Sequence, residues 1–147
     1  MSEYLKALTL VDLLSEKHKK LREEVLRLWH EENSETINDT ESHLLAMVSK
    51  REITMAESAR ELNISRQAAH KCTLKLMDHG YISIQSSEAN KRNKLLGLTP
   101  KGEAFCCEMS KIKAKIEAEI ASNLGIEFVE TMKNALRKNW INDKTSI

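Results

Sequence analysis

The sequence predicts a mainly α-helical fold that carries one small β-hairpin. Glycine and proline together number five among 147 residues, and good helix formers such as leucine, lysine and glutamate are frequent. Long stretches near both ends place apolar residues at three- and four-residue steps, the period of an amphipathic helix. Between them, residues 81–98 contain two short strand-like runs around a polar segment. A chain of this length is one domain, or one domain with a helical extension.

The N-terminal part is predicted to form one long helix from Tyr4 to about Trp29. Its apolar stripe consists of Leu5, Leu8, Val11, Leu14, His18, Leu21, Val25 and Leu28. A narrow stripe on so long a helix usually requires a partner. Further on, Asn38 and Glu41 have the spacing of a capping box, which predicts the start of a short helix. Glu52–Ile53 is predicted to be a very short strand that pairs with the hairpin.

Two short helices joined by a tight turn are predicted between residues 54 and 80. Thr54 and Glu57 have the spacing of a capping box at the start of the first helix. Asn63 tolerates a left-handed backbone and ends that helix. Ser65 is the predicted N-cap of the second helix, and Gly80 ends it. Such a pair is a helix-turn-helix, although a generic helical domain also contains short helix pairs.

A basic hairpin follows the second helix directly. Its predicted strands are Tyr81–Gln85 and Leu95–Leu98, and the segment between them carries Lys91, Arg92 and Lys94. Thr99 then caps a further helix that begins at Pro100, because proline is favoured at the first helical position. A helix-turn-helix followed by a basic hairpin is the order of elements in a winged helix. The alternative is a helical domain with a chance hairpin.

In these segments the chain resembles the bacterial MarR-type (multiple-antibiotic-resistance regulator) transcription factors. The resemblance rests on Ser65 and the helix behind it, Leu76 to Ile82, Asn90-Lys91-Arg92, and Leu98-Thr99-Pro100-Lys101-Gly102. It covers nearly the whole chain, including the long helices on both sides. In one respect the chain differs, because Asn90 occupies the position of an aspartate two residues before the wing arginine. An asparagine there still holds the guanidinium of Arg92 by a hydrogen bond, but without charge assistance.

Two more helices are predicted after the hairpin, at residues 100–123 and 126–140. Their apolar stripes are Phe105, Met109, Ile112, Ile116 and Ile120, and Val129, Met132, Leu136 and Trp140. Together with the first helix they predict a homodimer built on a shared helical bundle, as the resemblance also implies. Packing within one chain is the alternative. We therefore expect a helical dimerisation region (1–35 and 100–141), a winged-helix DNA-binding lobe (36–99) and a tail (142–147).

The charge distribution favours the same division of the chain. The net charge is only +1, but residues 50–102 contain ten lysines and arginines against five acidic residues. The rest of the chain contains thirteen basic and seventeen acidic residues. A basic middle flanked by acidic helices suits a DNA-binding lobe on a dimerising body, and uneven solvation is the simpler alternative.

The outward face of the second short helix is predicted to read duplex DNA. The predicted contacts of this helix are Ser65, Arg66, Gln67, His70, Lys71 and Lys75. Glutamine suits adenine and the cations near the helix start suit guanine, whereas Lys75 is expected at a phosphate. In the wing, Arg92 is expected in the minor groove, with Lys91 and Lys94 at phosphates. A symmetric dimer would present two such helices to a palindromic site.

The sequence contains none of the common catalytic motifs. A phosphate loop, a G-x-S-x-G elbow, an H-E-x-x-H pair and a dinucleotide fingerprint are all missing. Cys72, Cys106 and Cys107 lack the spacing of metal ligands. We therefore expect no enzymatic activity, no cofactor and no metal. Because the chain shows no signal peptide and no membrane-spanning run, we expect a cytoplasmic protein.

The resemblance implies a repressor that a small molecule releases from DNA. Such effectors enter a cleft between the helical bundle and the DNA-binding lobe, and the candidate lining residues here are His18, Leu21 and Phe105. Two other readings remain open. One is a redox-sensing regulator that is switched by cysteine oxidation, and the other is a winged helix used only to bind proteins.

Overall fold

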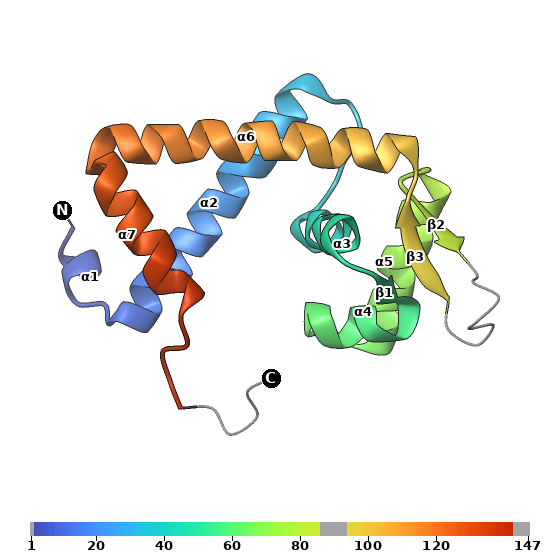
Figure 1. The fold of residues 1–147 in the computed structure, drawn as a ribbon, viewed down its shortest axis with the longest axis horizontal. Helices are drawn as coiled ribbons and strands as arrows, with labels where there is room; N and C mark the ends of the chain where they lie inside the picture. The colour runs from blue at the N-terminus through green and yellow to red at the C-terminus, as the bar shows by residue number, and fades with distance from the viewer. Residues whose placement is uncertain (1, 86–93, 143–147) are drawn as a thin grey trace. The chain divides into compact units, whose positions relative to one another are not determined.

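The computed structural model describes residues 2–85 and 94–142. Its elements are α1 (Glu3–Lys6), α2 (Leu10–Glu32), α3 (Asp39–Lys50), β1 (Ile53–Thr54), α4 (Met55–Leu62), α5 (Arg66–Asp78), β2 (Ile82–Gln85), β3 (Leu95–Leu98), α6 (Pro100–Leu124) and α7 (Ile126–Arg137) (Figure 1). The chain divides at residue 112 into two compact units, so that α6 begins in the first and ends in the second. The mainly helical fold class with a small sheet is confirmed. Among the described residues, no helix has both the length and the apolar character to cross a membrane.

The predicted long N-terminal helix is wrong at its start. It is broken between Lys6 and Leu10, and α2 continues to Glu32. The reason is local, because Thr9 has an extended backbone and its hydroxyl accepts a hydrogen bond from the Asp12 N–H. A threonine in that conformation caps a new helix rather than continuing the old one. The last helix likewise ends earlier than expected, at Arg137.

The lobe that holds the helix-turn-helix is built around a three-stranded antiparallel sheet. The strand order is β1-β3-β2, with Ile53 opposite Leu96 and Ile82 opposite Leu98. Helices α3, α4 and α5 lie together beside this sheet (Figure 1). The buried residues of this core are Leu44, Leu45, Ile53, Ala59, Leu76, Ile82 and Leu96. The predicted short strand at Glu52–Ile53 is present as β1, one residue further along.

An aromatic cluster joins α2 to this lobe. The Phe105 ring on α6 makes edge-on contacts with Trp29 on α2 and with Tyr81 just before β2, at centroid separations of 5.1 and 5.7 Å. All three rings are buried. Edge-to-face packing of this kind adds about 0.5–1.5 kcal/mol per pair to the burial of the rings. The cluster therefore fixes the end of α2 and the first turns of α6 on the same core.

Candidate nucleic-acid interface

The two short helices form the predicted helix-turn-helix. Thr54 accepts a hydrogen bond from the Glu57 N–H, and the Glu57 carboxylate accepts one in return from the Thr54 N–H, so the predicted capping box is present. Asn63 ends α4 in the left-handed conformation, at φ 55° and ψ 46°. Ser65 then accepts from the Ala68 N–H at 3.1 Å and starts α5. Short local hydrogen bonds therefore set the angle between α4 and α5.

The outward face of α5 is the one that the sequence predicted. Ala69, Thr73 and Leu76 are buried against the core, and Cys72 is half-buried. The exposed side chains include Ser65, Arg66, Gln67, His70, Lys71 and Leu74. Most of the predicted DNA contacts of this helix are therefore available on one accessible surface.

A depression of about 900 Å³ lies beside this face. Its lining includes Arg66 and His70 of α5, Arg60 of α4, and Lys94, the residue before β3. The structure thus gathers three predicted contacts and adds Arg60, which the sequence did not predict. Arg60 was detectable as a basic side chain one turn before the helix-ending Asn63. An open basic depression of this kind attracts polyanions.

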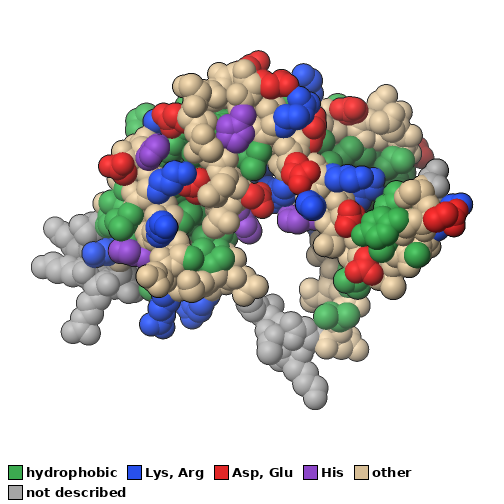
Figure 2. Space-filling model, turned by 180° about the vertical axis from the view of Figure 1, so that it is seen from behind, with side chains coloured by type: hydrophobic (Ala, Val, Ile, Leu, Met, Phe, Trp, Pro, Cys, Tyr) green, Lys and Arg blue, Asp and Glu red, His purple; other side chains and the backbone are tan. Residues whose placement is uncertain are grey.

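On the face shown in Figure 2, lysine and arginine side chains lie among acidic and hydrophobic ones. This view agrees with the small net charge of +1. Binding to nucleic acid would then depend on where the few cations lie rather than on the charge of the whole chain.

The tip of the predicted wing, with Asn90, Lys91 and Arg92, lies outside the described residues. At its base, Lys94 is exposed and its carbonyl accepts a hydrogen bond from the Met55 N–H at 2.9 Å. The base of the hairpin is therefore attached to the first turn of α4. This attachment holds Lys94 at the rim shared by α4 and α5.

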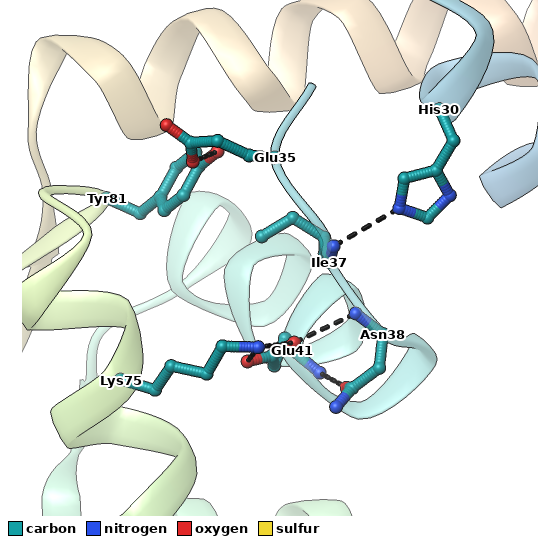
Figure 3. A network of polar contacts seen from close by, with 7 residues as sticks. All are labelled: His30, Glu35, Ile37, Asn38, Glu41, Lys75 and Tyr81. Atoms are coloured by element: carbon teal, nitrogen blue, oxygen red, sulfur yellow. Dashed lines mark hydrogen bonds and ion pairs between the residues drawn. The ribbon is translucent and has the colours of Figure 1, made fainter. Parts of the chain in front are cut away.

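Lys75 differs from the other predicted contacts. Its ammonium lies 2.8 Å from Glu41 Oε2, and the Glu41 side chain is only 2% exposed (Figure 3). The expected phosphate contact is therefore occupied by a carboxylate of the protein itself. Sequence spacing places Lys75 on the outward face but contains no sign of this partner on α3.

The three candidate effector residues lie on two helices, α2 and α6. Phe105 lines a cavity of about 200 Å³ with Trp29, Tyr81 and Lys101, among others, but His18 and Leu21 do not line it. His18 precedes Trp29 by eleven residues on α2, roughly 16 Å along the helix at 1.5 Å per residue. His18 and Leu21 are both exposed there. His18 and Leu21 on α2 and Phe105 on α6 therefore remain a prediction for an effector pocket.

Charges next to this cavity are already paired. The Glu35 carboxylate accepts hydrogen bonds from Lys101 Nζ at 2.6 Å and from the Tyr81 hydroxyl. The bond from Lys101, followed by that from Tyr81, holds the pKa of Glu35 below its ordinary value. Burial, and then the bond to Glu35, raises the pKa of Tyr81. These hydrogen bonds fix Glu35, Tyr81 and Lys101 to one another, and they do not leave an acid–base pair ready for catalysis.

Cys72 and Cys106 are half-buried, whereas Cys107 is exposed. Within the described ranges, no group of three or more histidine, cysteine or acidic side chains is placed to hold a metal ion. Burial, followed by the nearby charge of Glu41, raises the pKa of the Cys72 thiol to about 11. A thiol of this kind is mostly protonated at neutral pH and reacts slowly with oxidants. Cys72 is therefore poorly suited to the redox switch that the sequence left open.

The rates at which the cysteines are alkylated test the raised pKa of Cys72. At pH 8, we expect iodoacetamide to modify the exposed Cys107 well before Cys72. Raising the thiol pKa from 9.0 to about 11 lowers its thiolate fraction roughly a hundredfold. Peptide mapping by mass spectrometry gives both rates in the same sample. Equal rates at the two sites would show that Cys72 is neither buried nor perturbed as described.

The capped helix pair, the sheet and the basic depression together define a winged helix-turn-helix protein. The chain is similar to the HTH-type transcriptional regulator TcaR of Staphylococcus aureus, at 26% identity over 107 residues, which are 71% of each protein. No family model matches the chain.

Solved structures show the same fold. MarR from E. coli, in its reduced form, matches with a TM-score of 0.73 at 20% identity, over 88% of this chain and 95% of that one. A MarR family protein of Mycobacterium tuberculosis in complex with salicylic acid matches with a TM-score of 0.69 at 24% identity, over the same shares. The resemblance to MarR-type regulators is confirmed.

Proposed function

We propose that this protein is a homodimeric regulator of transcription that binds duplex DNA in a sequence-specific manner. The observation that carries the proposal is the grouping of Arg60, Arg66, His70 and Lys94 around one depression beside the exposed face of α5. Cations grouped in this way neutralise phosphates, and the neighbouring amide and imidazole side chains suit base edges. The similar protein TcaR is an HTH-type transcriptional regulator, and we propose no enzymatic activity.

The contacts divide by chemistry. Arg66, Gln67, His70 and Lys71 lie in the first two turns of α5, the part of a recognition helix that reaches base edges in the major groove. Arg60, Ser65 and Lys94 are better suited to phosphates, because they lie at the rim of the depression or at the helix start. Lys91 and Arg92 remain predicted wing contacts, with Arg92 in the minor groove.

A second copy of the chain is the proposed partner of the helical region. Several large apolar side chains of α2 are exposed, namely Leu10, Val11, Leu13 and Leu14. The C-terminal unit, considered by itself, also exposes apolar side chains, namely Leu124, Ile126, Phe128, Leu136, Trp140 and Ile141. Apolar exposure on this scale is typical of an interface. We accordingly keep residues 1–35 and 100–141 as the dimerisation region and 36–99 as the DNA-binding lobe.

The proposed action is repression, relieved by a small molecule. The salicylic acid complex of the similar mycobacterial protein supports a small-molecule effector. A ligand of this kind releases DNA only if it binds the DNA-free arrangement of the protein more tightly. Action on chromosomal DNA makes the cytoplasm the proposed location.

Fluorescence anisotropy with labelled duplexes tests the proposal. We expect Arg66→Ala to weaken binding to a preferred site by about 1–3 kcal/mol, the contribution of one good base contact. Arg60→Ala should instead weaken binding to every sequence and lower the salt dependence by about one counterion. Lys111→Ala, which removes an exposed lysine of α6 away from the depression, is the matched control. Binding that is insensitive to salt, or equally weak in all three variants, would contradict the proposal.

A further inference from the structure

A polar network connects the segment between α2 and α3 to the recognition helix α5. His30, in the last turn of α2, accepts a hydrogen bond from the Ile37 N–H at 3.2 Å (Figure 3). Asn38 and Glu41 then form the reciprocal capping box of α3. Glu41 also receives the ammonium of Lys75, at 3.0 Å from Oε1 and 2.8 Å from Oε2. One carboxylate thus serves both the start of α3 and the last turn of α5.

The two partners of this ion pair differ strongly in burial. Glu41 is 2% exposed, whereas the Lys75 side chain is 41% exposed. A buried carboxylate requires a partner, so Glu41 constrains Lys75 far more than Lys75 constrains Glu41. The four-carbon arm of Lys75 reaches from α5 to the first turn of α3 and cannot do so from a very different rotation of α5 about its axis.

A second lysine fixes the C-terminal end of the same helix. Lys101 Nζ donates to the carbonyl of His79, the C-cap of α5, at 2.8 Å and to Glu35 at 2.6 Å. It also lies 4.5 Å from the centroid of the Tyr81 ring. Glu35 lies in the segment that links α2 to α3, and Glu41 lies in the first turn of α3. These two carboxylates therefore hold α5 at two points, through one lysine each.

We propose that the Glu41–Lys75 pair sets the rotation of the recognition helix, so that both residues position the DNA-reading side chains. Lys75 is then a positioning residue rather than a phosphate contact. The proposal rests on the proposed function. A rotation of about 20° would move the helix surface, at a radius of about 5–6 Å, by about 2 Å. Hydrogen bonds to base edges tolerate only a few tenths of an ångström, whereas phosphate attraction tolerates far more.

Three single variants of the full-length protein separate these roles. Glu41→Gln keeps the cap, because glutamine also serves in a capping box, but loses the charged pair. Lys75→Met removes the positive charge that pairs with Glu41. Asn38→Ala is the matched control, since it removes the capping oxygen of α3 and leaves the Glu41–Lys75 pair in place. Each is measured by anisotropy against the preferred duplex and a scrambled duplex of the same composition, over a range of salt.

The proposal predicts a loss of sequence discrimination. Glu41→Gln and Lys75→Met should each lower the ratio of affinities for the two duplexes by about tenfold or more, the effect of one misaligned base contact. The salt slope should not change, and the double variant should be no worse than either single one. Asn38→Ala should retain the wild-type ratio even if its melting temperature falls. If Lys75→Met does not fold, Glu41→Gln against Asn38→Ala still decides the question.

A different pattern would overturn the inference. If Lys75→Met weakens both duplexes equally and lowers the salt slope by about one, while Glu41→Gln binds like the wild type, Lys75 contacts phosphate. Equal loss of discrimination in Asn38→Ala would mean that general stability of α3, not the ion pair, is what matters. If the wild-type protein itself fails to bind DNA, the proposed function is wrong. That result is distinct from the two outcomes above, in which the wild type binds and only the variants differ.

Discussion

Replacing Gly102 with alanine is expected to destabilise the folded protein by about 3 kcal/mol, the upper part of the range for overpacking a core. Gly102 lies in the first turn of α6, which packs against the chain that enters β2. A Cβ atom there would be 2.1 Å from the Tyr81 carbonyl oxygen and 3.2 Å from its carbonyl carbon. Both are backbone atoms, so no change of rotamer relieves the clash. The same carbonyl accepts the Thr99 N–H, and moving it breaks the junction of sheet and helix.

Urea unfolding at a fixed protomer concentration measures this effect, because the stability of a dimer depends on concentration. The matched control is Glu103→Ala, which places the same side chain one position along, on the exposed side of α6. It should change the free energy of unfolding by only a few tenths of a kcal/mol, through the lost charge near the helix start. A Gly102→Ala protein as stable as the control would mean that α6 does not approach Tyr81 this closely.

Replacing Phe105 with alanine is expected to cost about 4 kcal/mol, within the range for large-to-small changes in a core. The ring is 4% exposed and makes edge-on contacts with both Trp29 and Tyr81. Its removal leaves a cavity where α2, α6 and the sheet meet. Both partner rings would lose their fixed orientation, so the near-UV circular dichroism should weaken together with stability.

Phe128→Ala is the matched control for this substitution. Phe128 is 56% exposed, and its removal leaves little or no cavity. The free energy of unfolding of the protomer should be the same as in the wild type. If the apolar face of α7 is a dimer surface, the variant should self-associate more weakly. Equal losses of stability in the two variants would contradict the assignment of Phe105 to the core and Phe128 to the surface.

Local signals in the sequence were enough to predict most of the elements. The caps at Asn38, Thr54 and Ser65, and the left-handed Asn63, act within four residues, so their chemistry is readable directly from spacing. The break at Thr9 was missed because apolar periodicity runs through it. Threonine is compatible with both a helix interior and a cap, and only the backbone conformation decides.

Long-range pairings were not readable in the same way. Lys75 and Glu41 are 34 positions apart, and a pattern of outward-facing residues does not reveal which of them meets another element. Arg60 was not predicted for a similar reason, because it meets Arg66, His70 and Lys94 only in the folded protein. His18 and Leu21 belong to an apolar stripe in the sequence but are exposed on α2, whereas Phe105 is buried. An apolar stripe identifies one face of a helix, but it does not identify the element that packs against that face.

Selection from a pool of random duplexes is the measurement that tests the central claim most directly. If the protein is a dimeric winged-helix regulator, rounds of binding and amplification should enrich one inverted repeat. The centres of its half-sites should lie about one turn of DNA, roughly ten base pairs, apart. Binding to that repeat should weaken steeply with salt. Failure to bind any duplex at low salt, or binding without enrichment of a symmetric site, would contradict the account.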